Sequence, residues 1–118
     1  MSRIDVEVLK SRAALEAFAA TWQRVESGRP VTPRLAFGSL HELFSAITEK
    51  RLELIRYAAE HEGLNIRQLA QRLGRDYKNV HTDVKALVEL GLLNKNNSGL
   101  LTAPFDEIVI HATVRDAA

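Results

Sequence analysis

Residues 64–93 read LNIRQLAQRLGRDYKNVHTDVKALVELGLL, and this stretch decides the fold. Asn65 is a favourable N-cap, and the Gln68 side chain can bind back to its amide, so a helix is predicted from here to about Leu73. Gly74 then supplies a tight turn. The apolar positions of this helix recur with helical spacing and should form its buried side: Ile66, Leu69, Ala70 and Leu73.

A second amphipathic helix follows the turn. Asp76 can cap its start, and Gly91 stands where a left-handed residue would end it. Its predicted buried face holds Tyr77, Val80, Val84, Leu87 and Val88. At about 100° per residue, the outer face carries Lys78, Thr82, Lys85 and Glu89, with Asn79 and His81 at its margins. Two short helices joined in this way indicate a helix-turn-helix whose second helix reads a DNA groove.

The segment before this motif predicts a strand and a helix. Arg3–Val8 alternates polar and apolar residues, which is typical of a half-buried strand. Ser11 can cap a helix that runs to about Glu26, and residues 28–33, with two prolines, form a connector. The apolar stripe of this helix consists of Leu15, Phe18, Ala19, Trp22 and Val25.

Two further helices should precede the motif. Ser39 and Glu42 form a capping box for a short helix that ends near Ile47. Thr48 can cap another helix, from Glu49 to about His61. The residues that this second helix should bury are Leu52, Ile55 and Ala59.

A hairpin and a strand are predicted after the motif. Residues 92–95 and 100–103 can pair as strands around the turn-rich loop Asn96-Asn97-Ser98-Gly99. Glu107–Thr113 reads as a final strand. The order helix, helix, turn, helix, hairpin is that of a winged helix, so the predicted fold is α+β and mainly helical, with the hairpin as its wing.

The motif resembles the winged helix-turn-helix of prokaryotic transcription regulators of the MarR and ArsR groups. More narrowly, RLAFGSLHELFSAITEKRLELI, LGRDYKNVHTDVKALVELGLL and APFDEIVI resemble a small archaeal and bacterial family of winged-helix regulators, some of them antitoxin-like. The resemblance covers about residues 34–111 and implies a DNA-binding regulator. Its distinctive residues are Arg75, Asp76, Val80, Asp83, Gly91, Pro104 and Asp106. The chain differs from the MarR group in having strands instead of long helices at its ends.

The composition fits one small soluble domain. A chain of 118 residues can bury one core. It has no cysteine, no apolar run long enough to cross a bilayer and no signal-like start, so we expect a cytoplasmic protein. Residues 63–103 hold six Lys/Arg against three Asp/Glu, although the net charge of the chain is only +1. The positive excess therefore lies in the segment predicted to bind DNA.

The predicted DNA contacts come from the motif and the wing: Arg67, Arg75, Lys78, Asn79, His81, Thr82, Lys85, Lys95, Asn96 and Asn97. Each has a structural alternative. His81 either touches a phosphate or packs as a half-buried imidazole, and Asn96 and Asn97 are either minor-groove contacts or turn residues. Asp83 points towards the first helix of the motif and is expected to pair with Arg72, Arg75 or a backbone amide, because a carboxylate near phosphate is repelled.

Nothing in the sequence favours catalysis or a cofactor. The histidines at 41, 61, 81 and 111 have no metal-binding spacing, and neither a P-loop nor a GxSxG motif occurs. We therefore expect no enzyme, no metal and no cofactor. The hypothesis is a homodimeric repressor that binds double-stranded DNA, with residues 76–90 in the major groove and the wing, 92–103, on the flanking groove or backbone.

The ends of the chain are interpreted as an extension for dimerisation. The predicted division is residues 1–33 for dimerisation, 34–103 for the winged helix and 104–118 for a strand and tail. The residues expected at the dimer interface are Ile4, Val6, Phe18, Trp22, Ile108 and Ile110. An alternative stays open, in which the terminal strands or the first helix hold a toxin-like protein partner. The strands 3–8 and 107–113 could do so by adding to the partner's sheet.

Overall fold

The computed structural model describes residues 2–9, 16 and 32–115. Their contacts group them into two compact units, which are described separately. One unit holds the terminal strands together with residues 32–45, and the other holds residues 46–106 with Ser2. Residues 34–45, which the sequence division assigned to the winged helix, therefore group with the chain ends.

The first unit is built on a three-stranded parallel sheet. Strand β1 (Arg3–Val8) lies between β2 (Arg34–Phe37) and β5 (Glu107–Ile110) and pairs with both in parallel. The predicted strand at residues 3–8 is confirmed with both its bounds, and the C-terminal strand is confirmed but ends at Ile110 instead of Thr113. The strand β2 was not predicted, because its four residues are too few to show alternation.

Apolar and polar residues alternate along β1, and this alternation determines which of its side chains are buried. Ile4 and Val6 are buried, whereas Asp5 and Glu7 on the opposite face are half-buried. Both carboxylates lie near basic side chains of the same unit. Glu7 contacts Arg34 of β2 at 2.5 Å, and Asp5 lies 3.6 Å from the His111 ring. The helix predicted at residues 11–26, with Phe18 and Trp22, lies outside the described residues.

Helix α2 (Leu40–Ala46) begins as predicted, although its cap differs in one bond. The Ser39 hydroxyl accepts from the Glu42 amide at 3.1 Å. The Glu42 carboxylate accepts from the Gly38 amide at 2.9 Å instead of the Ser39 amide, so the reciprocal half of the predicted capping box is replaced by a bond one residue earlier.

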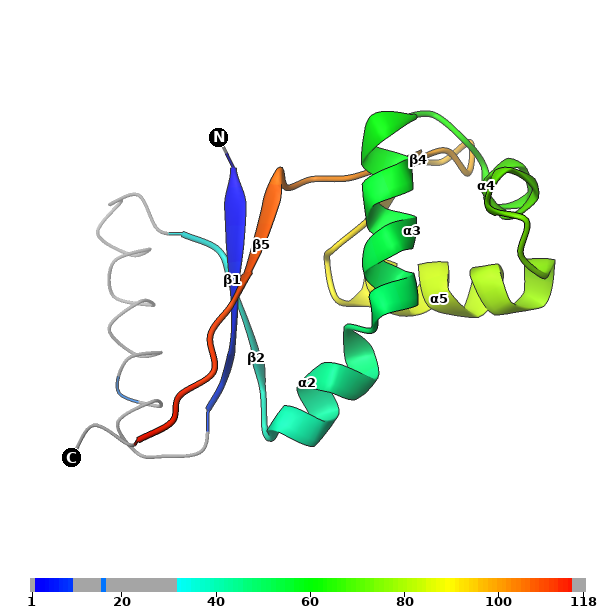
Figure 1. Ribbon diagram of the computed structural model, residues 1–118. Coiled ribbons are helices and arrows are strands. Elements are labelled where there is room, and N and C mark those ends of the chain that lie inside the picture. The colour runs from blue at the N-terminus through cyan, green and yellow to red at the C-terminus, as the bar shows by residue number, and fades with distance from the viewer. Residues whose placement is uncertain (1, 10–15, 17–31, 116–118) are drawn as a thin grey trace. The chain divides into compact units, whose positions relative to one another are not determined.

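The second unit contains α3 (Glu49–Glu60), α4 (Ile66–Leu73), α5 (Tyr77–Glu89) and the hairpin β3 (Asn94–Lys95) and β4 (Leu101–Thr102). Leu64 bridges to Leu101 and thus adds a third segment to the hairpin. This is the winged helix that the sequence predicts, shown in green to orange in Figure 1. Its core consists of Ile47, Leu54, Ile55, Ala58, Leu69, Ala70, Val80, Val84, Leu87, Leu92, Leu93 and Leu101.

The buried side of α3 differs from the prediction. Ile55 is buried as expected, but the other buried residues are Leu54 and Ala58. Leu52 is half-buried and Ala59 is exposed. The buried face of α3 is thus rotated from the predicted stripe, because α3 carries apolar residues on more than one side and packing decides which of them are covered.

Among the helices of the described residues, none is both long and apolar enough to cross a membrane.

Candidate nucleic-acid interface

The start of α4 and of α5 follows from local capping. The Asn65 side chain accepts from the Gln68 amide at 2.8 Å, and the Gln68 side chain accepts from the Asn65 amide at 3.0 Å, which confirms the predicted capping box. The Asp76 carboxylate accepts from the Asn79 amide at 3.3 Å. Because both caps are formed, the two helices begin at defined residues on either side of the Gly74 turn.

Helix α5 separates an apolar from a polar side. Val80, Val84 and Leu87 are buried. The polar residues predicted for the outer face are all exposed: Lys78, Asn79, His81, Thr82, Lys85 and Glu89. The Thr82 hydroxyl donates to the Lys78 carbonyl at 3.0 Å, so its oxygen retains acceptor capacity for a donor on a ligand. The outer face is therefore available for an external partner.

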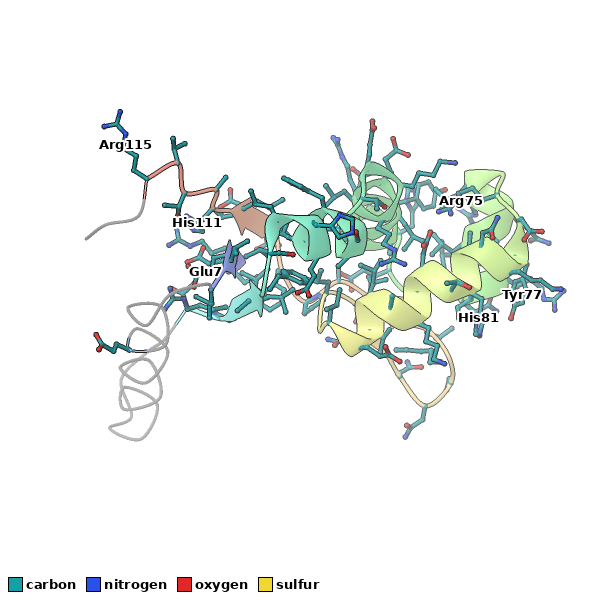
Figure 2. The ribbon with its side chains drawn as sticks, turned by 90° about the horizontal axis from the view of Figure 1, so that it is seen from below. Glu7, Arg75, Tyr77, His81, His111 and Arg115 are labelled. Atoms are coloured by element: carbon teal, nitrogen blue, oxygen red, sulfur yellow. The ribbon has the colours of Figure 1, made fainter. Side chains whose placement is uncertain are left out.

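Tyr77 belongs to this exposed surface, although the sequence placed it on the buried face. Tyr77 is 43% exposed, because it is the first residue of α5 and lies at the edge of the packed core. The Arg67 guanidinium carbon lies 5.3 Å from the centre of its ring, and the His81 ring centre lies 5.9 Å away. Figure 2 shows Tyr77 and His81 together at the start of α5. We call Arg67, Tyr77 and His81 the aromatic–arginine cluster.

Part of the outer face borders a groove beside the wing. The groove has a volume of about 380 Å³ and is lined by both apolar and charged side chains. Its lining residues are Ile66, His81, Val84, Lys85, Val88, Glu89 and Lys95. Thus His81 and Lys85 of α5, which the sequence nominated separately from Lys95 of the wing, border the same space.

Arg75 has a different environment from the other nominated cations. Its guanidinium donates to Asp83 at 2.7 Å, and Arg51 of α3 donates to the other carboxylate oxygen at 3.0 Å. Arg51 also donates to the Ala46 carbonyl at 2.9 Å. Asp83 thus has Arg75 as the partner expected from the sequence and Arg51 as one not foreseen. The DNA role of Arg75 stays a prediction, but its guanidinium already holds a carboxylate.

The ionisation of Asp83 reflects these two partners. Burial raises the pKa of the Asp83 carboxyl, but hydrogen bonds from Arg75 and Arg51, together with their charges, outweigh that effect and hold the pKa below its usual value. Asp83 is therefore an anion at neutral pH. It joins α3, the turn after α4 and α5 by two charge-assisted hydrogen bonds.

The nominated wing residues differ in what they do within the hairpin. The Asn96 side chain accepts from the amides of Ser98 and Leu100, each at 2.9 Å, so it shapes the turn. Lys95 and Asn97 are exposed. Asn96 therefore acts as a turn residue, and a DNA contact from it remains a prediction.

The residues nominated for dimerisation also differ. Ile4 is 5% exposed and Val6 is fully buried within the single chain, so these side chains offer little surface to a second copy. Ile108 is half-buried and Ile110 is 38% exposed. Phe18 and Trp22 lie outside the described residues. Within residues 2–9, 16 and 32–115, no group of three or more His, Asp or Glu residues is placed to hold a metal ion.

Comparisons with known proteins found a matching family model and similar solved structures. Solved structures that are similar include a multiple antibiotic-resistance repressor (MarR) from Listeria monocytogenes, at 22% identity and a TM-score of 0.46. The match covers 77% of this chain and 60% of the repressor, so the chain spans less than two thirds of that protein. No curated protein matches significantly. The HVO_A0114 family model matches residues 46–110, which is more than half of the chain, and the chain therefore belongs to the HVO_A0114 family.

Proposed function

We propose that this chain is a sequence-specific DNA-binding transcriptional regulator, acting as a homodimeric repressor. Helix α5 would enter the major groove, and the wing would lie on the flanking groove or backbone. The observation that carries this proposal is the outer face of α5, where Lys78, Thr82 and Lys85 are exposed on a capped helix.

The charge pattern of the winged helix supports the same function. In the described residues, the cations near Asp83 are paired with it, whereas Lys78, Lys85 and Lys95 have no carboxylate within ion-pair distance. Unpaired lysines on one surface attract the phosphate backbone, because binding releases the counterions of DNA. His81 and Lys85 border the same groove as Lys95, so one backbone segment could contact both α5 and the wing.

The test begins with selection of bound duplexes from random DNA by the purified protein. Two reader helices in a symmetric dimer should select half-sites separated by about 10 bp or a multiple of it. We then expect the triple variant Lys78→Ala, Thr82→Ala, Lys85→Ala to lose affinity for the selected duplex. Each phosphate-binding lysine lost should lower the salt slope by about one unit, and each base-reading residue lost should cost roughly 1–3 kcal/mol at one position.

Two controls separate binding from folding. Lys50→Ala removes an exposed lysine from α3 and should leave DNA affinity unchanged. Val84→Ala removes two buried carbons beneath α5 and should lower the free energy of unfolding by about 2 kcal/mol, with a loss of binding that follows the loss of folded protein. Unchanged affinity and salt dependence in the triple variant would exclude α5 as the DNA reader.

A second candidate function is an antitoxin-like interaction module. The observation that favours it is the described sheet, in which β2 and β5 are both edge strands. An edge strand can pair with a strand of another protein through its free backbone groups. Co-purification of a defined neighbouring gene product, lost when Ile110 on β5 is changed to proline, would support this function over DNA binding alone.

A further inference from the structure

The aromatic–arginine cluster brings together the two helices of the motif at one exposed point. Arg67 is the second residue of α4, and Tyr77 is the first residue of α5. The guanidinium carbon lies 5.3 Å from the Tyr77 ring centre, within the range of a cation–π contact. Both side chains are exposed, so the contact is made at the surface and does not serve to fill the core.

Arg67 keeps its hydrogen-bond donors while it rests on the ring. A guanidinium contacts an aromatic ring through its flat face or its edge, and it has five N–H donors, more than such a contact can occupy. Among the described residues, no carboxylate is paired with Arg67, in contrast to Arg51 and Arg75, which share Asp83. Planar, bidentate donors of this kind match the oxygens of a phosphate.

We propose that Tyr77 is a positioning residue, whose ring holds the Arg67 guanidinium in place to bind a backbone phosphate of DNA. This inference rests on the proposed function and extends it to a residue that the motif itself assigns to the core. A free arginine side chain loses rotamer freedom when it binds, so an arginine already held on a ring loses less and binds more tightly. The His81 ring also lies near the Tyr77 ring, with 5.9 Å between the ring centres.

The test is a double-mutant cycle measured on the selected DNA duplex. Arg67→Ala should weaken binding to all sequences alike, by about 3- to 10-fold, and lower the salt slope by about one unit. Tyr77→Leu removes the ring and should weaken binding by about 2- to 5-fold, as expected for an exposed cation–π contact. Tyr77→Phe keeps the ring, so the DNA affinity of this variant should stay within about 2-fold of that of the unaltered chain.

The coupling energy between Arg67 and Tyr77 shows whether Tyr77 acts through Arg67. If Tyr77 acts through Arg67, Tyr77→Leu should have little further effect in a chain that already carries Arg67→Ala. Arg72→Ala is the matched control, because Arg72 is an exposed arginine in the last turn of the same helix. Its effect should simply add to that of Tyr77→Leu. Thermal melting of each variant checks that the fold is kept.

The outcomes separate this inference from the proposed function. If the unaltered chain selects a duplex but the effects of Arg67→Ala and Tyr77→Leu add independently, Tyr77 does not position Arg67 and only this inference is overturned. Equal losses for Tyr77→Phe and Tyr77→Leu would overturn it too, because the hydroxyl would then be the acting group. If the unaltered chain selects no duplex, the proposed function fails and this inference fails with it.

Discussion

Asp83 shows how one residue can hold helix α5 in place. Its side chain is 15% exposed, and those of its partners Arg51 and Arg75 are 17% and 21% exposed. Pairing charges at this depth stabilises little compared with apolar packing, because desolvation offsets much of the attraction. Removal of one partner is costly, however, since it leaves the remaining charges without compensation. The triad therefore connects α3, the turn and α5 through contacts whose loss should be costly.

We predict that Asp83→Asn lowers the free energy of unfolding by about 2–3 kcal/mol at neutral pH, somewhat less than for a fully buried pair. Because the folded-state pKa of Asp83 is depressed, its stabilisation is fully present above the unfolded value near 3.8 and is lost as pH falls through the folded pKa. Denaturant unfolding of both proteins between neutral pH and about pH 2 measures this difference.

The stability gap between the two proteins should thus be constant down to about pH 5 and close at lower pH. Glu60→Gln is the matched control, because Glu60 pairs only with the largely exposed Arg56 and should contribute little. A gap that stays open at the lowest pH would show that the carboxylate charge is not what stabilises the contact.

At the scale of the element, the turn between α4 and α5 depends on Gly74. Its φ of 64° and ψ of 33° lie in the left-handed region, and the next amide, of Arg75, donates to the Ala70 carbonyl at 3.0 Å. An added Cβ would meet no heavy atom within 4 Å. Backbone strain, and not a clash, is therefore what restricts this position to glycine.

We predict that Gly74→Ala lowers the free energy of unfolding by about 1–2 kcal/mol, the usual strain of a Cβ in the left-handed region. Gly74→Asn should be less harmful, because asparagine tolerates this conformation better. Urea unfolding measures both. If the two variants were equally stable, steric strain at this residue would not be the determinant of the turn.

The elements that could be predicted are those specified by neighbouring residues. Asn65 with Gln68, and Asp76 with the Asn79 amide, define helix starts within four residues, so sequence alone located them. The strand β2 depends instead on its pairing with β1, which lies far away in the sequence. Likewise, Asp83 and Tyr77 each contact an arginine of another helix, Arg51 and Arg67 respectively. No local sequence pattern predicts such contacts.

At the scale of the whole molecule, the winged helix follows β2 and precedes β5 in the sequence, and these two strands belong to one sheet. Strand β1 pairs with β2 before the winged helix and with β5 after it, in parallel on both sides. Parallel pairing cannot be made by a tight hairpin and needs a long connection. The chain between β1 and its partner β5 supplies such a connection, and it includes β2 and the winged helix. The first and last strands of the described residues are thus neighbours in one sheet, and β5 is an edge strand of it.

We predict that this edge contributes to a symmetric homodimer, because a single reader helix covers too few base pairs for useful specificity. Sedimentation at tens of micromolar protein should show a species of twice the 13.2 kDa chain mass. Ile110→Asp should shift it towards monomer, since Ile110 is a partly exposed apolar residue on β5. Val114→Asp, which alters a nearly fully exposed residue beyond the strand, is the matched control and should not. A monomer under these conditions, both with and without the selected DNA, would contradict the dimer and require that one chain reads its site alone.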